Sequence, residues 1–342
     1  MRVLYCDHPE ADFLSGVLYM GLCEELGADQ VVDYPPKDSF KGKVHYYPSP
    51  YTHAAWPADD IDIPSWQKLA KEAPEGVGCT APFEWMTAQS TRSWSRDEVV
   101  AGLKSKDFDL VILASPRKYN SQALTDLTES VGRSAMPPIV LVDGEDYSQI
   151  RQDLADTFGV KVYFKRELLP GAGRGGLRVE PFPFASPVPA RAAVAKTIDV
   201  LFIGGGSWPG RQVAVDALRN AFGERFVRGA GYSYSQYLDA IASARVAVSV
   251  RGHGYDTLRY WEIPSFDTLL VADRQPVIRP FPFQHGVHAL FFDTTHELVE
   301  AVRCALEDEP WQRRLALAGN SWLRAHHTAR ARARQLLTVS VA

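Results

Sequence analysis

Features that mark specialised protein classes are scarce in this 342-residue chain. Apolar runs never reach the ~18 residues that a membrane-spanning helix needs, and no signal-peptide pattern follows Met1. The cysteines are too few and too scattered for a disulfide framework or a zinc site: Cys6, Cys23, Cys79 and Cys304. We therefore expect a cytoplasmic protein with reduced thiols and no transmembrane segment.

An excess of charge of one sign is also lacking. The 37 Lys and Arg residues and 41 Asp and Glu residues leave a formal net charge of −4 at pH 7. This balance argues against a dedicated nucleic-acid binder but does not exclude a nucleic acid as a substrate. No internal repeat and no low-complexity tract is visible. A chain of this length without repeats predicts two domains, each with its own core.

The first half of the chain alternates predicted strands and helices. Strand patterns cover residues 2–6, 31–32, 44–47, 109–114, 138–143 and 160–164, and helical patterns cover residues 11–26, 123–131 and 147–158. This alternation predicts a parallel sheet, buried on both faces, in a domain that spans residues 1–168. Residues 48–95 combine six prolines with four tryptophans, and we expect loops and short helices over the sheet edge there, where a substrate could bind.

A Gly- and Pro-rich stretch at residues 171–189, with a short strand predicted near residues 177–179, separates this part from a second α/β pattern. Predicted strands follow at residues 197–203, 225–228, 244–250, 268–272 and 289–293. Predicted helices lie at residues 211–222, 235–243 and 295–306, and one long helix runs from about residue 310 into the arginine-rich tail. The sequence therefore predicts a second domain over residues 169–342, closed by a long helix.

Residues 251–264, with the sequence RGHGYDTLRYWEIP, follow a predicted buried strand. Glycines at the carboxyl end of a strand leave room for a ligand, and Asp256 and Thr257 are residue types that start helices. Asp256, Arg259 and Glu262 are spaced by three residues and so fall near one helix face. We interpret Arg259 as a phosphate clamp and Glu262 as an acceptor for sugar or ribose hydroxyls. The alternative is a buried helix with a structural Arg–Glu ion pair.

A set of motifs in the second half resembles a known family. The segments are YFKRELL (163–169), RVEPFPFA (178–185), DVLFIGGGSWPGR (199–211), YLDAIASARVAVSVRGHGYDTLRYWEIP (237–264) and LFFD with an ELVEAV helix (290–302). Together they resemble CgeB-like glycosyltransferases of the GT-B superfamily, of the glycosyl transferase family 1 type. The Gly-x-Asp-Thr-x-Arg-x-x-Glu portion also resembles the donor segment of exostosin-type enzymes. One departure is residues 265–267, Ser-Phe-Asp, where the family commonly has a small or glycine residue.

This resemblance implies a GT-B fold, in which two doubly wound Rossmann-like domains face each other across a cleft. It implies an enzyme that transfers a sugar from a nucleotide-diphosphate sugar, bound by the C-terminal domain, to an acceptor of unknown identity, bound by the N-terminal domain. Ligands do bind at the carboxyl ends of strands and between domains in such architectures. The resemblance further implies no cofactor and no metal, and no Asp-x-Asp metal motif follows a predicted strand.

Carried onto this sequence, the resemblance assigns donor binding to a defined set of residues. Arg259 would bind the diphosphate and Glu262 the ribose or sugar hydroxyls. The remaining candidates would contact the phosphates or the base of the donor, or belong to the rest of the donor segment: Gly204, Gly205, Arg211, Tyr232, Arg251, His253, Asp256 and Thr257. The glycines of residues 204–206 do not form the dinucleotide fingerprint, because Trp208 and Pro209 interrupt the spacing to its third glycine. Lys165 is a further candidate to contact the phosphates in the cleft.

Glycosyl transfer with inversion needs a general base at the acceptor hydroxyl. Acidic residues and one histidine crowd the loop after the first strand, which faces the donor in this architecture: Asp7, His8, Glu10 and Asp12. We interpret His8 as the base and Asp12 as its partner or as the base itself. A solvated surface histidine is the alternative for His8.

Two other functions and one other surface are open from the sequence. An epimerase that acts on nucleotide sugars would share the architecture. A receiver-like signalling module would explain the first half, but a convincing acidic pair with a downstream lysine is lacking. In the tail, Arg330 and Arg334 fall on one helix face and predict a cationic helix end that complements its own dipole. Attraction to a membrane surface or to a polyanionic acceptor is the alternative.

Overall fold

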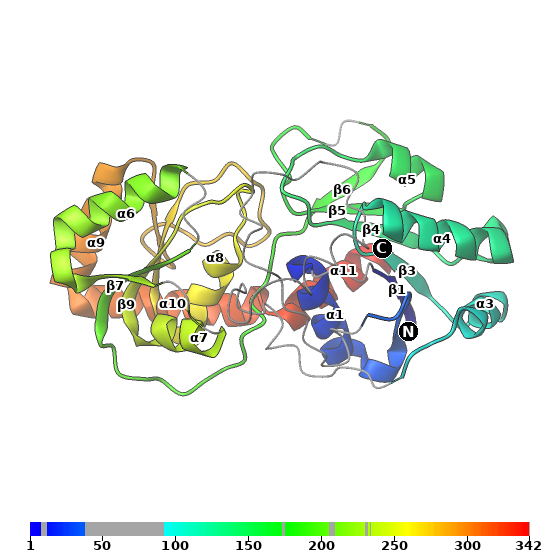
Figure 1. Ribbon diagram of the computed structural model, residues 1–342, viewed down its shortest axis with the longest axis horizontal. Helices are drawn as coiled ribbons and strands as arrows, with labels where there is room; N and C mark the ends of the chain where they lie inside the picture. Colours follow the sequence, from blue (N-terminus) through cyan, green and yellow to red (C-terminus); the bar gives the residue numbers. More distant parts are fainter. Residues whose placement is uncertain are drawn as a thin grey trace, which may run out of the picture.

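The computed structural model describes residues 1–7, 12–37, 92–172, 175–204, 209–229, 232 and 234–341. The predicted strand at residues 44–47, most of the loop region at residues 48–95, and Cys79 lie outside the described residues. Figure 1 shows two lobes, each built around its own sheet, with both marked chain ends in the same lobe.

The first lobe contains a sheet of six parallel strands in the order β2-β1-β3-β4-β5-β6. Its strands are β1 (Val3–Cys6), β2 (Val31–Asp33), β3 (Leu110–Leu113), β4 (Ile139–Asp143), β5 (Val162–Lys165) and β6 (Arg178–Pro181). Its helices are α1 (Phe13–Leu26), α3 (Arg96–Lys104), α4 (Lys118–Val131) and α5 (Gln152–Phe158). The predicted buried parallel sheet is confirmed.

Alternating side chains of the first sheet enter two different cores, because successive strand residues point to opposite faces. Val3 and Tyr5 pack with Leu18 of α1, whereas Leu4 packs with Leu124 of α4. Helix α1 is well delimited: the Asp12 side chain accepts a hydrogen bond from the Ser15 N–H at 2.9 Å, and Gly27 follows its last residue with a φ of 90°, a conformation that glycine adopts most readily.

The second lobe contains a sheet of five parallel strands in the order β11-β10-β9-β7-β8. Its strands are β7 (Ile198–Ile203), β8 (Phe226–Gly229), β9 (Ala244–Ser249), β10 (Leu269–Asp273) and β11 (Leu290–Phe292). Its helices are α6 (Pro209–Phe222), α7 (Tyr234–Ser243), α8 (Leu258–Glu262), α9 (Thr295–Glu307) and α10 (Glu309–His326). Side chains of α6, α9 and α10 cover one face, and those of α7 and α8 pack on the other.

The prediction of one long closing helix from residue 310 onward is wrong in one respect: the segment forms two helices. Helix α10 ends at His326, and α11 (Ala329–Val341) begins three residues later. Between them, the backbone of Ser186 bonds to the chain on both sides of Thr328: the Ser186 N–H donates to the His327 carbonyl at 2.8 Å, and the Ala329 N–H donates to the Ser186 carbonyl at 3.1 Å. These bonds replace helical ones and turn the chain into the first lobe.

Helix α11 packs against α1 in the first lobe, as Figure 1 shows. The approach is close, because a Cβ on Gly21 would lie 2.1 Å from the Ala329 carbonyl oxygen. Arg330 and Arg334 of the tail both bind Glu25 of α1, at 2.7 and 3.0 Å, and they hold the pKa of Glu25 at about 2. The arginine face is thus directed at a carboxylate of the same chain.

The predicted boundary at residues 168 and 169 stays a prediction, but the first sheet extends beyond it. Strand β6 pairs with β5 in parallel as far as Pro181, so the short strand predicted near residue 177 belongs to the first sheet. Among the described residues, none of the helices has the length and apolar character that a membrane crossing requires.

Candidate functional site

Parallel strands all end at the same edge of their sheet, and polar residues gather at both of these edges. We call the carboxyl ends of β7, β9 and β10 the second-sheet edge; Gly204, Arg251 and Asp273 lie there. The carboxyl ends of β1, β4 and β5 form the first-sheet edge; residues there include Asp7, Asp143 and Lys165. Most of the site residues predicted from the sequence lie at one of these two edges.

The guanidinium group of Arg259, on α8, lies against the backbone of Gly204. A Cβ on Gly204 would be 3.1 Å from Cζ and Nη2 of Arg259, so a side chain at this position would crowd the arginine. Within the described part of the chain, the buried Nε of Arg259 has no hydrogen-bond partner. A buried N–H without a partner costs about 1–3 kcal/mol, which an anionic ligand would recover. Arg259 and Gly204, both predicted, are therefore brought together.

Arg211, on α6, contributes a second positive charge to this edge. Its Nε donates to the backbone carbonyls of Val250 and Arg251, at 3.2 and 2.9 Å. A Cβ on Gly252 would lie 2.8 Å from its Nη2. Burial and, next, the positive charge of Arg259 lower the pKa of Arg211 to about 10, so it stays protonated at neutral pH. Two neighbouring guanidinium groups create a field that attracts anions.

A half-buried carboxylate lies near Arg211 at the end of β10. Asp273 accepts the N–H of Arg251 with both oxygens, at 3.2 and 3.3 Å, and burial raises its pKa to about 6. The Arg251 guanidinium lies 3.8 Å from the centre of the Tyr255 ring and donates to the His253 carbonyl at 3.0 Å. The His253 side chain itself is exposed.

Glu262 ends α8 and is 1% exposed. Its Oε2 accepts the hydroxyl of Tyr237, on α7, at 2.5 Å. Burial and the Glu262 charge raise the pKa of Tyr237. The tyrosine hydroxyl therefore stays protonated and donates the hydrogen bond to Glu262. This bond fixes the orientation of the carboxylate, whose predicted role toward hydroxyl groups stays a prediction.

Asp256 points into the protein interior and joins three separate segments. It accepts hydrogen bonds from the Phe184 N–H at 2.7 Å, from Trp261 Nε1 at 3.0 Å and from Arg279 Nη2 at 3.3 Å. Of the two capping-type residues predicted to start helix α8, Asp256 lies outside it, because the helix begins at Leu258. Thr257 is its N-cap without a capping side-chain bond; its hydroxyl instead contacts that of Ser249 at 3.0 Å.

Two further predicted donor residues have different outcomes. Tyr232 is half-buried and packs over Gly229, where a Cβ would lie 2.3 Å from the tyrosine Cε2. It follows β8, the strand next to β7, and its predicted stacking on a base stays a prediction. Gly205 lies outside the described residues.

The first-sheet edge begins with a buried ion pair at the end of β1. Asp7 is 1% exposed and binds Lys37 Nζ at 2.5 Å and the Ser15 hydroxyl at 2.5 Å. Burial raises the pKa of Asp7, and the charge of Lys37 opposes that shift. Asp12 caps α1 at the same loop, whereas the other two predicted residues of this loop, His8 and Glu10, lie outside the described residues.

Lys165 is buried in the first lobe instead of extending toward the second-sheet edge. Its Nζ lies 2.9 Å from Asp143 Oδ2 with both side chains 0% exposed, and 4.2 Å from the centre of the Tyr147 ring. Burial lowers the pKa of Lys165, and the negative charge of Asp143 opposes that shift. Tyr163 also donates to Asp143, at 2.5 Å. This environment supports a structural role, so the predicted phosphate contact of Lys165 has no geometric support.

Sequence reasoning missed three residues that shape the site. Asp273 and Glu167 are acidic residues at or just after predicted buried strands, and that position could have identified both. Tyr237 lies on a different helix from Glu262 and 25 residues before it. Nothing in the local sequence pattern connects the two, and only the packing of α7 beside α8 does.

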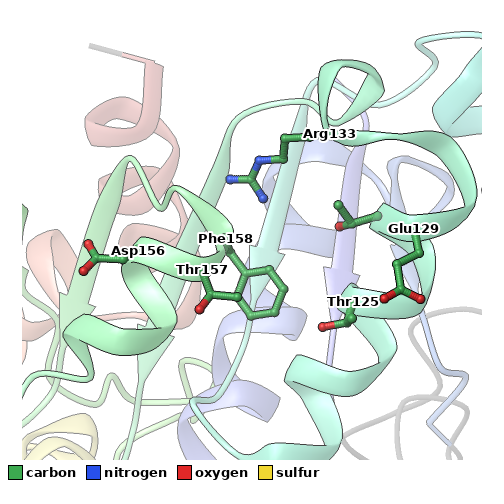
Figure 2. A pocket seen from close by; sticks show the side chains of 7 residues that line it. Thr125, Glu129, Arg133, Asp156, Thr157 and Phe158 are labelled. Carbon is green, nitrogen blue, oxygen red and sulfur yellow. The ribbon is translucent and has the colours of Figure 1, made fainter.

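Two other features of the described residues bear on ligand binding. No group of three or more His, Cys, Asp or Glu side chains is placed there to hold a metal ion. Figure 2 shows a hollow between α4 and α5, lined by Thr125, Glu129, Arg133, Asp156, Thr157 and Phe158. Because Phe158 precedes β5 and Arg133 precedes β4, this hollow lies toward the amino ends of the strands, away from both sheet edges described above.

Comparisons with known proteins agree with the arrangement of the second lobe. Residues 189–338 match the family described as Glycosyl transferase-like, a segment that contains every described residue of the second-sheet edge. No curated protein sequence matches the chain.

Several solved structures share the fold across the whole chain. HepE from Anabaena, in complex with UDP and glucose, is 12% identical with a TM-score of 0.56, and 100% of each chain is covered. The same protein with UDP-glucose gives a TM-score of 0.53, again at 12% identity and 100% coverage of both chains. A glycosyltransferase from Rickettsia africae is 8% identical with a TM-score of 0.58, over 99% of this chain and 97% of that one. The predicted α/β architecture, with two parallel sheets covered by helices, is thereby confirmed, and over residues 189–338 the chain resembles glycosyl transferases.

Proposed function

We propose that the protein is a glycosyltransferase that takes a sugar from a nucleotide-diphosphate sugar without needing a metal ion. The observation that carries this proposal is Arg259, whose buried Nε has no partner within the described residues and whose guanidinium lies on Gly204 beside Arg211. Two guanidinium groups at the carboxyl edge of a parallel sheet suit a diphosphate, which binds arginine through charge-assisted hydrogen bonds.

The comparisons support the same ligand class. The Anabaena protein holds UDP with glucose in one structure and UDP-glucose in another. The match to glycosyl transferases covers the lobe that carries both arginines. We therefore place the donor at the second-sheet edge and the acceptor at the first-sheet edge, in an assignment that uses the two lobes for different halves of the reaction.

Each edge would act on a different part of the reaction. Departure of a nucleoside diphosphate places extra negative charge on its terminal phosphate, and fixed positive charges at that point stabilise the transition state. Arg259 and Arg211 supply those charges. Glu262, oriented by Tyr237, would accept hydroxyl groups of the ribose or sugar. On the first lobe, His8 or Asp12 would receive the acceptor proton if the enzyme inverts the anomeric centre.

Titration of the purified protein with UDP and with other nucleoside diphosphates tests the proposal. We expect millimolar or tighter binding in buffer that contains a chelator, and no more than a small change when magnesium is added, because the arginines take the place of a metal. Binding that requires magnesium or manganese would contradict the metal-independent part. Absence of binding under all conditions would contradict the whole proposal.

Product analysis separates a transferase from an epimerase. A nucleotide sugar incubated with candidate acceptors should release the nucleoside diphosphate and give a glycosylated product. A changed sugar that is still attached to the nucleotide, formed without any acceptor, would instead identify an epimerase.

A further inference from the structure

Residues 251–257, which we call the donor loop, are held by a carboxylate of the other lobe. Glu167 stands two residues after β5 in the first lobe and is 1% exposed. Its Oε2 accepts the N–H of Tyr255 at 2.9 Å, and its Oε1 accepts the N–H of Asp256 at 3.0 Å. A single carboxylate thereby fixes two consecutive peptide groups of the donor loop.

Two neighbours of Glu167 complete a notch for the loop tip. Arg166 donates from Nη1 to the Asp256 carbonyl at 3.3 Å, forms an ion pair with Asp146 and lies 3.4 Å from Glu167 Oε1. The tip residue is Gly254, where a Cβ would lie 2.5 Å from Asp146 Oδ1 and 2.6 Å from Glu167 Oε1. We call Asp146, Arg166 and Glu167 the notch; a side chain at position 254 would displace at least one of their side chains.

The same loop also adjoins the positive charges of the second-sheet edge. At its start, Gly252 lies against Arg211 and the Arg251 carbonyl accepts from the Arg211 Nε at 2.9 Å. At its end, Thr257 is the N-cap of α8, the helix that carries Arg259. A loop of seven residues thus contacts the first lobe at its tip and positions both arginines at its two ends.

We propose that the notch is a positioning element for donor binding, and that it couples docking of the first lobe to the diphosphate site in the second. This inference rests on the proposed function. When the notch holds the loop tip, Arg211 and Arg259 are set for the diphosphate. By thermodynamic linkage, a diphosphate that binds this loop position also favours the docked lobes. The donor site is therefore not a property of the second lobe alone.

Variants of the full-length protein test the coupling with UDP as the probe. Glu167→Ala removes both acceptors, Glu167→Gln keeps an acceptor oxygen, and Gly254→Ala places a methyl group in the notch. None of these changes a residue that would touch the nucleotide. Matched controls are Glu180→Gln, a partly exposed first-lobe glutamate paired with Arg178, and Gly176→Ala, where an added Cβ meets nothing within 4 Å.

We expect UDP affinity, measured by calorimetry, to fall about 5- to 150-fold in Glu167→Ala and in Gly254→Ala, the usual range for coupling between sites. The UDP affinity of Glu167→Gln should lie between the affinities of these two variants and that of the wild type. The UDP affinities of both controls should stay within twofold of the wild-type value. Small-angle scattering without nucleotide should show a larger radius of gyration for Gly254→Ala than for Gly176→Ala, because the lobes separate when the tip cannot dock.

The outcomes distinguish this inference from the proposed function. UDP affinities within twofold of the wild type in both Glu167→Ala and Gly254→Ala, even with lowered melting temperatures, would overturn the coupling and leave the proposed function standing. A wild-type protein that binds no nucleoside diphosphate would overturn the proposed function, and the coupling to a diphosphate site with it.

Discussion

The two sheet edges present opposite electrostatic arrangements. At the first-sheet edge, cations are matched with carboxylates: Lys37 with Asp7, Lys165 with Asp143, and Arg117 with Glu145. At the second-sheet edge, Arg211 bonds to backbone carbonyls, and Arg259 lies against a glycine. Paired charges on one lobe suit neutral hydroxyl groups and proton transfer. On the other lobe, Arg211 and Arg259 have Asp273 as a neighbouring carboxylate, and the remaining positive charge suits phosphates.

This difference predicts separate kinetic effects for variants at the two edges. Changes at the first-sheet edge should alter turnover and leave donor affinity nearly constant, because a general base acts in the transition state. Changes at the second-sheet edge should alter donor affinity. A first-sheet-edge variant that lowers donor affinity, or a second-sheet-edge variant that lowers only turnover, would contradict this division of roles.

The largest effect is expected for the loop that follows β1. His8→Ala and Asp12→Asn should each lower turnover by ~100-fold or more, since general-base catalysis contributes about 10²–10⁴-fold, with little change in donor affinity. Asparagine is as good an N-cap as aspartate, so Asp12→Asn should leave α1 intact. The measurement is steady-state release of nucleoside diphosphate in the presence of an identified acceptor.

Asp156→Asn, a change on α5 of the same lobe, serves as the control for that experiment. Near-normal turnover in both His8→Ala and Asp12→Asn would move the base elsewhere or indicate a retaining mechanism. A fall in donor affinity as large as the fall in turnover would show that this loop binds the donor instead.

A smaller but still large effect is expected at the second-sheet edge. Arg259→Ala removes a charge-assisted contact to phosphate, which is worth about 1.5–3 kcal/mol, and should weaken nucleotide-sugar binding by about 10- to 150-fold. Arg219→Ala is the control, because Arg219 lies on the exposed side of α6 in an ion pair with Asp216. Equal affinities of Arg259→Ala and the wild type, measured by calorimetry, would assign Arg259 a structural role only.

The smallest effect concerns pH. Burial raises the pKa of Asp273 to about 6, so this carboxylate is charged at pH 7.5 and largely neutral at pH 5. Loss of its negative charge beside Arg211 removes repulsion of the diphosphate. Affinity for a nucleotide sugar should therefore rise about 2- to 5-fold from pH 7.5 to pH 5, as expected for one charge in a partly solvated site.

Two choices isolate Asp273 in that experiment. A nucleotide sugar is used because its diphosphate is esterified at both ends and lacks the ionisation near pH 6 that a terminal phosphate has. Asp273→Asn should bind equally at both pH values. A pH dependence that persists in Asp273→Asn would assign it to another group.

The sequence predicted the architecture well because the architecture depends on local patterns. Buried strands, helical spacing and glycine stops identified most elements of both sheets, and the motif of residues 251–264 led to Arg259. Those patterns could not predict where each helix begins to the residue or which tertiary contacts a side chain makes. The spacing of Asp256, Arg259 and Glu262 placed them on one face, yet Asp256 precedes the helix and binds Phe184, Trp261 and Arg279 in the interior.

Long-range contacts explain the other differences. Lys165 looked available for phosphate, but Asp143 on the neighbouring strand binds it, and a partner 22 positions earlier leaves no local signal. The helical pattern of the tail continues through His327 and Thr328. The structure breaks it there because backbone bonds to Ser186 compete with helical ones.

The pairing of Ser186 with Thr328 has a mechanical consequence. The chain passes between the lobes twice, once after β6 and once between α10 and α11, and these two passages lie side by side, bonded to each other. Two parallel tethers resist torsion far better than one, while they bend easily across their common plane. We therefore expect the lobes to move relative to each other mainly by opening and closing, with little twist.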